Sequence, residues 1–183
     1  MKEKKVKKKE KNKAFKATLS AGEVLSNAIE AKNLYGQSRH GEIIRGKVHY
    51  PLVEALYLLE KGKLNVFYKG KKISADSLMN ESKKLEENFF IRYCVFSNLR
   101  NRGYIVKTAL KFGADFRVYE KGKKPGEEHA KWIVYPVKET GHVTWYEFAA
   151  KSRVAHSTRK NLLIAIVDEE GDVTFYEISW IRP

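Results

Sequence analysis

The chain has 183 residues, with 36 Lys and Arg against 22 Asp and Glu, and a formal net charge of +14. Its 43% apolar and 12% aromatic residues are enough to bury a core, which excludes a disordered polycation, and its single cysteine excludes a disulfide framework or a cysteine-rich zinc site. No apolar run is long enough to cross a membrane, so we expect a cytoplasmic protein that binds a polyanion, of which nucleic acid is the commonest.

Half of the excess charge lies in a short N-terminal segment. Residues 1–16 hold nine Lys and two Glu, a net charge of +7, and the other 167 residues carry 27 Lys and Arg against 20 Asp and Glu, which is also +7. A segment of this composition does not fold by itself, so we predict a basic, disordered tail. Two interpretations stay open: a tether for phosphates, or a solvated tail that only raises solubility.

Residues 17–84 are predicted to form a small N-terminal α/β domain, because short strand and helix patterns alternate along them. Ser20 and Glu23 have the spacing of a capping box, and Pro51 suits the first position of a helix that Gly62 ends. The predicted elements, in chain order, are a strand at 17–19, a helix from Ser20, a strand at 42–48, a helix at 51–61, a strand at 64–68 and a helix from Ser74.

Residues 85–183 are predicted to form a C-terminal domain in which a mixed sheet is flanked by helices. An apolar stripe predicts one long helix at 81–102, in which Cys94 is expected to be a small buried residue. The stripe consists of Leu85, Phe89, Tyr93, Phe96 and Leu99. Strands are predicted at 104–110, 116–119, 132–137, 162–168 and 173–180, with a helix at 144–152. The last two strands should form a hairpin around the turn 169–172. The fold class is therefore α/β (α+β), with two small mixed domains.

Three side chains in this half suit the cleavage of RNA. Tyr119 ends the strand that enters a basic loop at 121–126, His129 follows that loop, and Lys160 ends the cationic segment 153–160. RNA carries its own nucleophile, the 2′-hydroxyl, so a base, an acid and a cation are sufficient for cleavage without metal. Each residue also has a structural interpretation: amphipathic packing for Tyr119, an exposed strand end for His129, and a solvated connector for the segment that contains Lys160.

Two other functions remain as alternatives. Asp115 and Glu120 lie near Lys121 in the sequence, which is the combination of carboxylates and lysine that metal-dependent nucleases use. The chain could instead be a non-catalytic subunit that binds RNA or supports an assembly. This second alternative predicts RNA binding without cleavage, whereas a metal-dependent nuclease would lose its activity in EDTA.

The sequence resembles the archaeal tRNA-splicing endonucleases. The similarity rests on YIVKTALKFGADFRVYEKG at 104–122, His129, the run at 153–183 that begins RVAHSTRKNLL, and PLVEALYLLEKGKLNV at 51–66; it covers about residues 20–183. The resemblance implies a restriction-endonuclease-like catalytic domain in which Tyr119 is the general base, His129 the general acid and Lys160 the transition-state stabiliser. It also implies a precursor tRNA substrate with a bulge-helix-bulge, and neither metal nor cofactor.

The resemblance further implies RNA contacts and an assembly. Arg153 would clamp a flipped bulge base, with either Trp180 or Arg182 as its partner, because a guanidinium plane can stack on a base. A chain of this length resembles the four-chain form of the family, which predicts a homotetramer, although a second subunit type stays open. The acidic turn, formed by Asp168, Glu169, Glu170 and Asp172, would then insert into a basic cleft of a neighbour; the alternative is a solvated turn.

Overall fold

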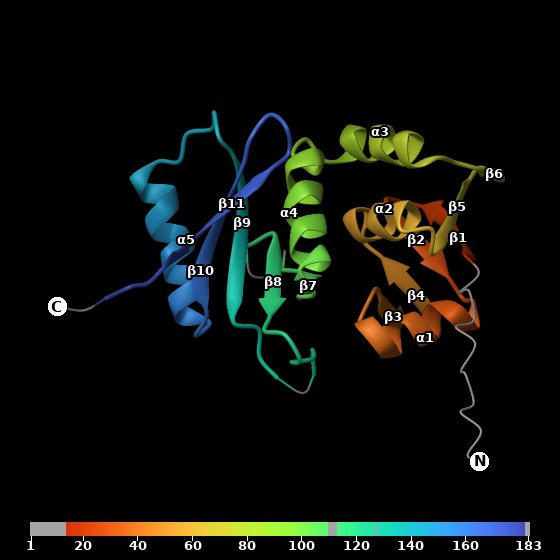
Figure 1. The fold of residues 1–183 in the computed structure, drawn as a ribbon, viewed down its shortest axis with the longest axis horizontal. Helices are drawn as coiled ribbons and strands as arrows, with labels where there is room; N and C mark the ends of the chain where they lie inside the picture. Colours follow the sequence, from red (N-terminus) through yellow and green to blue (C-terminus); the bar gives the residue numbers. More distant parts are fainter. Residues whose placement is uncertain (1–13, 110–112, 127, 182–183) are drawn as a thin grey trace, which may run out of the picture.

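The structure is a computed structural model that describes residues 14–109, 113–126 and 128–181. The N-terminal half forms one mixed sheet in the strand order β3-β4-β2-β1-β5-β6, with helices packed on it (Figure 1). Its elements are β1 (Phe15–Ser20), β2 (Glu23–Ser26), α1 (Ile29–Ser38), β3 (Glu42–Ile44), β4 (Lys47–Tyr50), α2 (Leu52–Glu60), β5 (Leu64–Tyr68), β6 (Lys71–Lys72) and α3 (Ala75–Leu85).

The C-terminal half forms a second mixed sheet in the order β11-β10-β9-β8-β7. In Figure 1, α4 covers one side of this sheet and α5 the other, as the sequence predicts. Strands β9 and β10 are parallel, and the other neighbouring pairs are antiparallel. No helix in the described part of the chain is long and apolar enough to span a membrane. The elements are α4 (Phe89–Asn101), β7 (Ile105–Thr108), β8 (Phe116–Tyr119), β9 (Trp132–Lys138), α5 (Trp145–Ser157), β10 (Asn161–Val167) and β11 (Val173–Ile178).

The N-terminal elements differ from the prediction in three places. No helix begins at Ser20, because Ala21 and Gly22 have positive φ angles of 49° and 79° and turn the chain directly from β1 into β2. The helix lies further along, as α1, and a short hairpin of β3 and β4 replaces the single predicted strand at 42–48. β1 starts at Phe15, two residues earlier than predicted, so the end of the predicted tail is paired with β5. Residues 1–13 of that tail lie outside the described residues.

The prediction of one long helix at 81–102 is wrong, because the structure has two helices there, α3 and α4, separated by a short non-helical segment. Glu86 has extended backbone angles, φ −135° and ψ 109°, and its carboxylate pairs with Arg92 on the next helix. Leu85 is 60% exposed and is therefore not part of the apolar stripe, whereas Phe89 is fully buried. The break allows α3 to pack on α2 while α4 lies against the C-terminal sheet. The predicted domain boundary at residues 84 and 85 falls at the end of α3.

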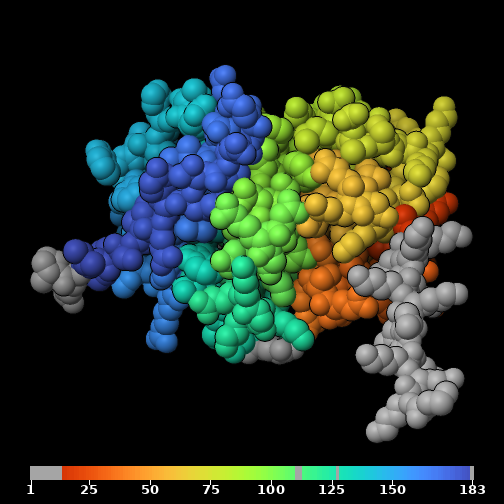
Figure 2. All heavy atoms as spheres, in the orientation of Figure 1, coloured from red at the N-terminus to blue at the C-terminus, as the bar shows by residue number. Residues whose placement is uncertain are grey.

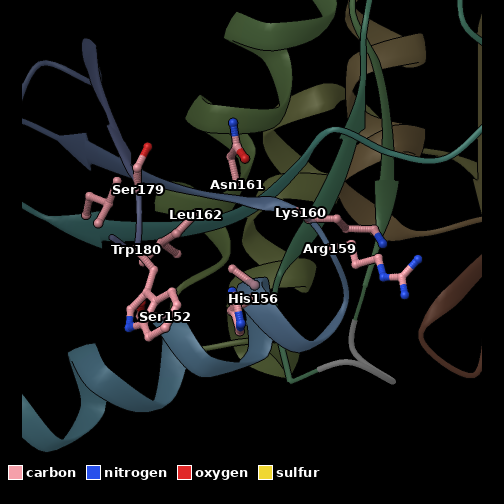
Figure 3. A pocket seen from close by; sticks show the side chains of 10 residues that line it. Ser152, His156, Arg159, Lys160, Asn161, Leu162, Ser179 and Trp180 are labelled. Carbon is pink, nitrogen blue, oxygen red and sulfur yellow. The ribbon is translucent and has the colours of Figure 1, made fainter. Parts of the chain in front are cut away.

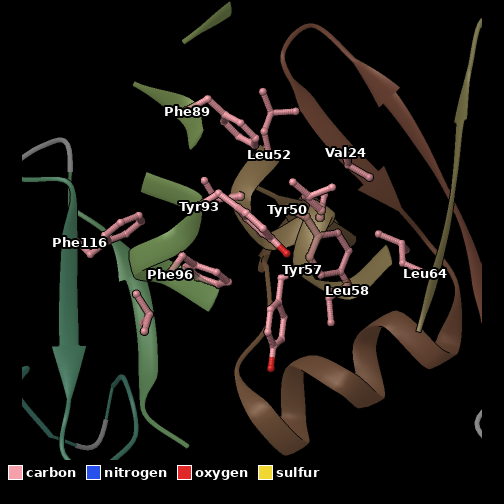
Figure 4. Close-up of a cluster of buried hydrophobic side chains, with 14 of the residues drawn as sticks. Val24, Tyr50, Leu52, Tyr57, Leu58, Leu64, Phe89, Tyr93, Phe96 and Phe116 are labelled. Carbon is pink, nitrogen blue, oxygen red and sulfur yellow. The ribbon is translucent and has the colours of Figure 1, made fainter. Parts of the chain in front are cut away.

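The core of the molecule runs through α4 from one half to the other. Phe96 on α4 packs edge-to-face against Tyr57 of α2, with ring centroids 5.8 Å apart, and its ring centroid lies 5.9 Å from that of Phe116 on β8. Figure 4 shows these rings as one connected cluster. Figure 2 shows the atoms of α4, in green, in direct contact with those of the N-terminal half. Burial of such aromatic side chains contributes about 1.5–3 kcal/mol each, so the two sheets stabilise each other.

A buried polar cluster also joins the halves. His40 Nδ1 lies 2.9 Å from Glu54 Oε1, and His40 Nε2 contacts the guanidinium of Arg100 on α4. The same guanidinium donates to the carbonyl of Ser38 at 3.0 Å, and Lys107 of β7 donates to the carbonyl of Gly41 at 2.5 Å. A neutral imidazole with its proton on Nδ1 satisfies both contacts of His40. We call His40, Glu54, Arg100 and Lys107 the interdomain cluster.

Candidate active site

The strand pairing brings three predicted residues to one edge of the C-terminal sheet. Trp132 of β9 lies opposite Val118 of antiparallel β8 and opposite Asn161 of parallel β10. The chain therefore leaves β8 and enters β9 and β10 at the same edge. Tyr119 is the last residue of β8, His129 lies three residues before β9, and Lys160 immediately precedes β10.

These three side chains line a single cavity. Its volume is about 370 Å³, and the residues around it are Arg117, Tyr119, Gly126, Glu128, His129, Ala130 and Lys160. Tyr119 and His129, which the sequence predicts to face each other across the base of the loop, both border this space. We call this space the catalytic cavity, because it contains the base, acid and cation types that RNA cleavage needs.

Ion pairs shape the loop between β8 and β9. Lys123 binds Glu128 with an Nζ to Oε1 distance of 2.6 Å, and Lys131 binds Glu120 at the same distance. Two backbone hydrogen bonds of 3.0 Å close turns in this loop. Lys123 N donates to Glu120 O, and Glu128 N donates to Lys124 O. Glu128, an acidic residue at the catalytic cavity, thus has a lysine partner outside the three predicted catalytic residues.

Tyr119 and His129 differ in their access to solvent. Tyr119 is 4% exposed and held within the sheet, while His129 is exposed on the chain that leaves the loop. The backbone at this edge is fixed by two bonds of 2.9 Å, from Lys131 N to the carbonyl of Val118 and from Asn161 N to the carbonyl of Lys131. The position of His129 therefore depends on the same strand ladder that holds Tyr119.

Lys160 is positioned by the end of a helix. The predicted helix at 144–152 is too short, because α5 continues to Ser157, and the interpretation of 153–160 as a solvated connector is wrong for most of its length. Arg159 has a positive φ of 55°, which ends the helix and turns the chain into β10. Two hydrogen bonds then hold Lys160 against the end of α5. Its backbone N donates to the carbonyl of Ala155 at 2.9 Å, and its Nζ donates to the carbonyl of Thr158 at 2.8 Å.

A second, smaller cavity adjoins the first, and Lys160 lines both. Its volume is about 220 Å³, and it lies between the end of α5 and the segment that follows β11. The ring centroids of His156 and Trp180 lie 4.6 Å apart. Figure 3 shows both side chains at this cavity. Trp180 is 58% exposed, and Arg153 is exposed one helical turn before His156. Arg182, the other predicted RNA-binding residue, lies outside the described residues.

The carboxylates that suggested a metal-dependent nuclease have cationic partners. Asp115 Oδ1 lies 2.8 Å from Nε of Arg92, and Glu120 binds Lys131. Burial raises the pKa of Asp115, and Arg92 opposes this rise. Among the described residues, no three His, Cys, Asp or Glu side chains come together in a group that could hold a metal ion.

The acidic turn joins β10 and β11 as a hairpin, as predicted. The carboxylate of Asp168 accepts a bond of 2.8 Å from the backbone N of Asp172, and Glu169 and Glu170 are exposed. Gly171 has a φ of 87°, and a Cβ there would lie 3.2 Å from Sγ of Cys94 on α4. Cys94 is buried, as the sequence predicts, and its sulfur lies close to the backbone of the turn at Gly171.

Comparison with known proteins identifies the family. Residues 89–175 match the model of the tRNA intron endonuclease catalytic C-terminal domain, and residues 15–79 match the model of the N-terminal domain of the same family. The tRNA-splicing endonuclease of Thermococcus onnurineus is 42% identical over 165 residues, which is 90% of this chain and 95% of the relative. That of Nanoarchaeum equitans is 48% identical over 139 residues, 73% of this chain and 89% of the relative.

The chain belongs to the tRNA intron endonuclease family. The resemblance found in the sequence is confirmed over both halves, and so is the prediction that the chain is an endonuclease. The catalytic cavity lies within the part that matches the catalytic-domain model.

Among the residues around the catalytic cavity that sequence reasoning missed, Arg117 is a second cation beside Lys160. It precedes Tyr119 by two positions on β8, and residues two apart on a strand face the same side of the sheet. This spacing was a signal that was available in the sequence. It became meaningful only once Tyr119 was known to face a cavity rather than the core.

Proposed function

We propose that this endonuclease excises introns from precursor tRNA by cutting bulge-helix-bulge splice sites. The single observation that supports the proposal best is that Tyr119, His129 and Lys160 line one cavity in a chain of this family. Bulged nucleotides suit such a site, because unstacked RNA can enter a cavity that a continuous duplex cannot.

The proposed chemistry needs one proton acceptor, one proton donor and one cation. Tyr119, acting as the phenolate, takes the proton of the 2′-hydroxyl, whose oxygen attacks the adjacent phosphorus. The bond from phosphorus to the 5′-oxygen breaks, and His129 in its protonated form gives that oxygen a proton. Lys160 stabilises the negative charge that develops on the phosphate oxygens. The products carry a 2′,3′-cyclic phosphate and a 5′-hydroxyl, and every step uses side chains of the protein and the RNA itself.

The decisive experiment is cleavage of a bulge-helix-bulge RNA in excess EDTA. We expect full activity, cyclic phosphate ends, and no cleavage when the attacking 2′-hydroxyl is replaced by hydrogen. Loss of activity in EDTA would favour a metal-dependent nuclease. Binding without cleavage, in the presence and absence of metal, would instead favour a non-catalytic subunit.

The acid assignment has a matched control. His129→Ala should lower the cleavage rate by about 10²- to 10⁴-fold, which is the usual contribution of a general acid. His142→Ala removes a histidine that is also exposed but lies outside the catalytic cavity, so it should cleave at the wild-type rate. Unchanged cleavage by His129→Ala would disprove the role of this histidine.

The second cavity is our proposed site for a bulge base. Trp180 lines this cavity, whereas Arg153 is exposed on α5 outside the lining and would have to reach in to stack on the base. Arg182 is the other possible partner of Arg153. Stacking of one base on an aromatic side chain is worth about 1–3 kcal/mol, so Trp180→Ala should weaken binding of uncleavable RNA about 5- to 150-fold. Binding at wild-type strength by both Trp180→Ala and Arg153→Ala would contradict this site.

We propose a homotetramer in which the acidic turn contacts a neighbouring subunit. Asp168, Glu169, Glu170 and Asp172 form a negative projection on a chain of charge +14, which suits a basic surface of another copy. Light scattering should give a mass near four chains for the wild type and a smaller mass for a Glu169→Lys, Glu170→Lys double variant. A tetramer that persists in this variant would argue against the turn as the contact.

A further inference from the structure

Arg117 faces the catalytic cavity but has no part in the chemistry described above. It lines the cavity together with Tyr119, His129 and Lys160. Its Nε is buried and has no hydrogen-bond partner, and the structure shows no ion pair for this side chain within the described residues. Partial burial of a guanidinium that has no carboxylate or carbonyl partner lowers the stability of the folded protein. A bound anion would supply the missing partner.

The residues around Arg117 make its partly buried positive charge still less favourable for folding. Lys107 of β7 lies directly opposite Arg117 in the sheet, and like charges in that arrangement destabilise a strand pair. Burial is the main cause that lowers the pKa of Lys107, and the positive charge of Arg117 is one of the charges that lower it further. Arg117 thus weakens the fold locally, as groups that are kept for function often do.

The catalytic cavity is electrically suited to an anion. Arg117 and Lys160 both border it, and within the described residues the Lys160 side chain donates a hydrogen bond to one backbone carbonyl, that of Thr158. Glu128, the carboxylate on its rim, binds Lys123 instead of either cation. A guanidinium presents several N–H donors in one plane and can hold two oxygens of a phosphate at once, which an ammonium group cannot do.

We propose that Arg117 is a substrate-binding residue that holds a non-bridging oxygen of the scissile phosphate. The inference rests on the proposed function and adds to it a second cation with a different task. Arg117 orients the phosphate through paired N–H donors, and Lys160 neutralises the charge that develops during attack. The orientation places the 2′-oxygen in line with the bond that breaks, so both substrate binding and the cleavage rate depend on Arg117.

The test compares Arg117→Gln with Arg45→Gln, which removes the same charge from an exposed turn of the N-terminal half. With a bulge-helix-bulge RNA, kcat/KM should fall about 10- to 100-fold in Arg117→Gln and stay unchanged in Arg45→Gln. Arg117→Lys should recover only part of the activity, because it restores the charge without the planar pair of donors.

Binding gives a second readout that does not need chemistry. For RNA with a 2′-deoxy nucleotide at the cleavage site, the slope of log Kd against log salt should become shallower by about 0.7–0.9 in Arg117→Gln, the effect of one lost phosphate contact. The Arg45→Gln control should keep the wild-type slope. If wild-type protein cleaves but Arg117→Gln matches it in kcat/KM and salt slope, the Arg117 proposal fails while the proposed function stands.

A measurement on the unmodified protein covers the case in which the variants do not fold. The Nη–H resonances of the Arg117 guanidinium should shift on titration with the 2′-deoxy RNA, because these N–H groups gain a phosphate acceptor. A resonance that does not move while the RNA binds would overturn the proposal. A wild-type chain that binds this RNA but cannot cleave the matching ribonucleotide substrate would instead overturn the proposed function.

Discussion

Two groups of cations in this molecule have opposite surroundings. In the interdomain cluster, Arg100 and Lys107 are buried, bond to backbone carbonyls across the two halves, and lie near the carboxylate of Glu54. At the catalytic cavity, Arg117 and Lys160 border open space and have no carboxylate partner among the described residues.

This difference in surroundings distinguishes cations that hold the fold together from those that we propose for substrate binding and catalysis. Burial alone would raise the pKa of Glu54, but Lys107, His40 and Arg100 together lower it, so this carboxylate is held ionised inside the protein. Charges that satisfy one another in this way hold elements together and leave no capacity for a ligand. Cations that keep their bonding capacity at a cavity weaken the fold slightly and are available to a phosphate. The predictions below test this distinction.

Among the variants that separate these two groups of cations, Lys160→Ala should have the largest effect. The cleavage rate in single-turnover experiments should fall about 10²- to 10³-fold, as for the loss of one group that stabilises the transition state. The free energy of unfolding should change by less than about 1 kcal/mol, because Lys160 contributes a single side-chain bond to a carbonyl. A large loss of stability would show that Lys160 belongs with the structural charges.

Glu54→Ala should have its effect on stability instead. Removal of one partner from a buried set of charges costs about 3–5 kcal/mol, because Lys107 and Arg100 are left without compensation. Denaturant unfolding measures this cost, and Glu81→Ala, which breaks a surface pair with Lys84, should cost far less because solvent screens that pair. Equal costs for the two variants would mean that the interdomain cluster is no stronger than a surface pair.

The same substitution in both regions gives the most direct comparison. Arg100→Gln should lower the free energy of unfolding by about 1.5–3 kcal/mol, since it removes bonds to Ser38 and Tyr104. Arg117→Gln should leave it within about 0.5 kcal/mol of wild type or raise it, because a repulsion with Lys107 disappears. A reversed order of the two values would contradict the distinction.

The smallest effect concerns pH. Burial lowers the pKa of His40 below its ordinary value of 6.5, and Glu54 only partly offsets this. Between the two values the unfolded chain binds a proton that the folded chain does not, so stability falls as the pH drops below about 6.5, by at most about 1.4 kcal/mol per pH unit. His40→Gln should remove this contribution, and His142→Gln should not. Identical pH profiles for wild type and His40→Gln would exclude His40 as the group responsible.

The sequence predicts this fold best where the residue pattern is local. The strand Phe116–Tyr119 and the hairpin around the acidic turn have clear alternation and turn residues, and the structure has them where expected. The break between α3 and α4 was missed, because Leu85 and Phe89 have helical spacing and only tertiary packing buries one and exposes the other. The helix at α1 lacks a clear apolar stripe, so its pattern does not distinguish it from a loop.

The candidate site shows a similar limit. Tyr119, His129 and Lys160 could be proposed from residue type and position, and the structure places them at one cavity, while their catalytic roles stay predictions. Arg117 could not be singled out, since a sequence does not show whether a strand arginine has a partner. That information depends on which residues lie across the sheet, and here the neighbour is another cation, Lys107.

The edge of the sheet that holds Tyr119, His129 and Lys160 has a consequence for how this enzyme can change. Tyr119 ends β8, and His129 and Lys160 precede β9 and β10, whose alignment with β8 is fixed through Trp132. The spacing of Tyr119 and Lys160 is therefore set by the strand ladder and not by the loop between β8 and β9. Insertions or deletions in that loop would alter what reaches the cavity without moving the strand ends that carry Tyr119 and Lys160. Substrate range can therefore evolve separately from chemistry, with the loop as the variable part and the strand ends as the constant one.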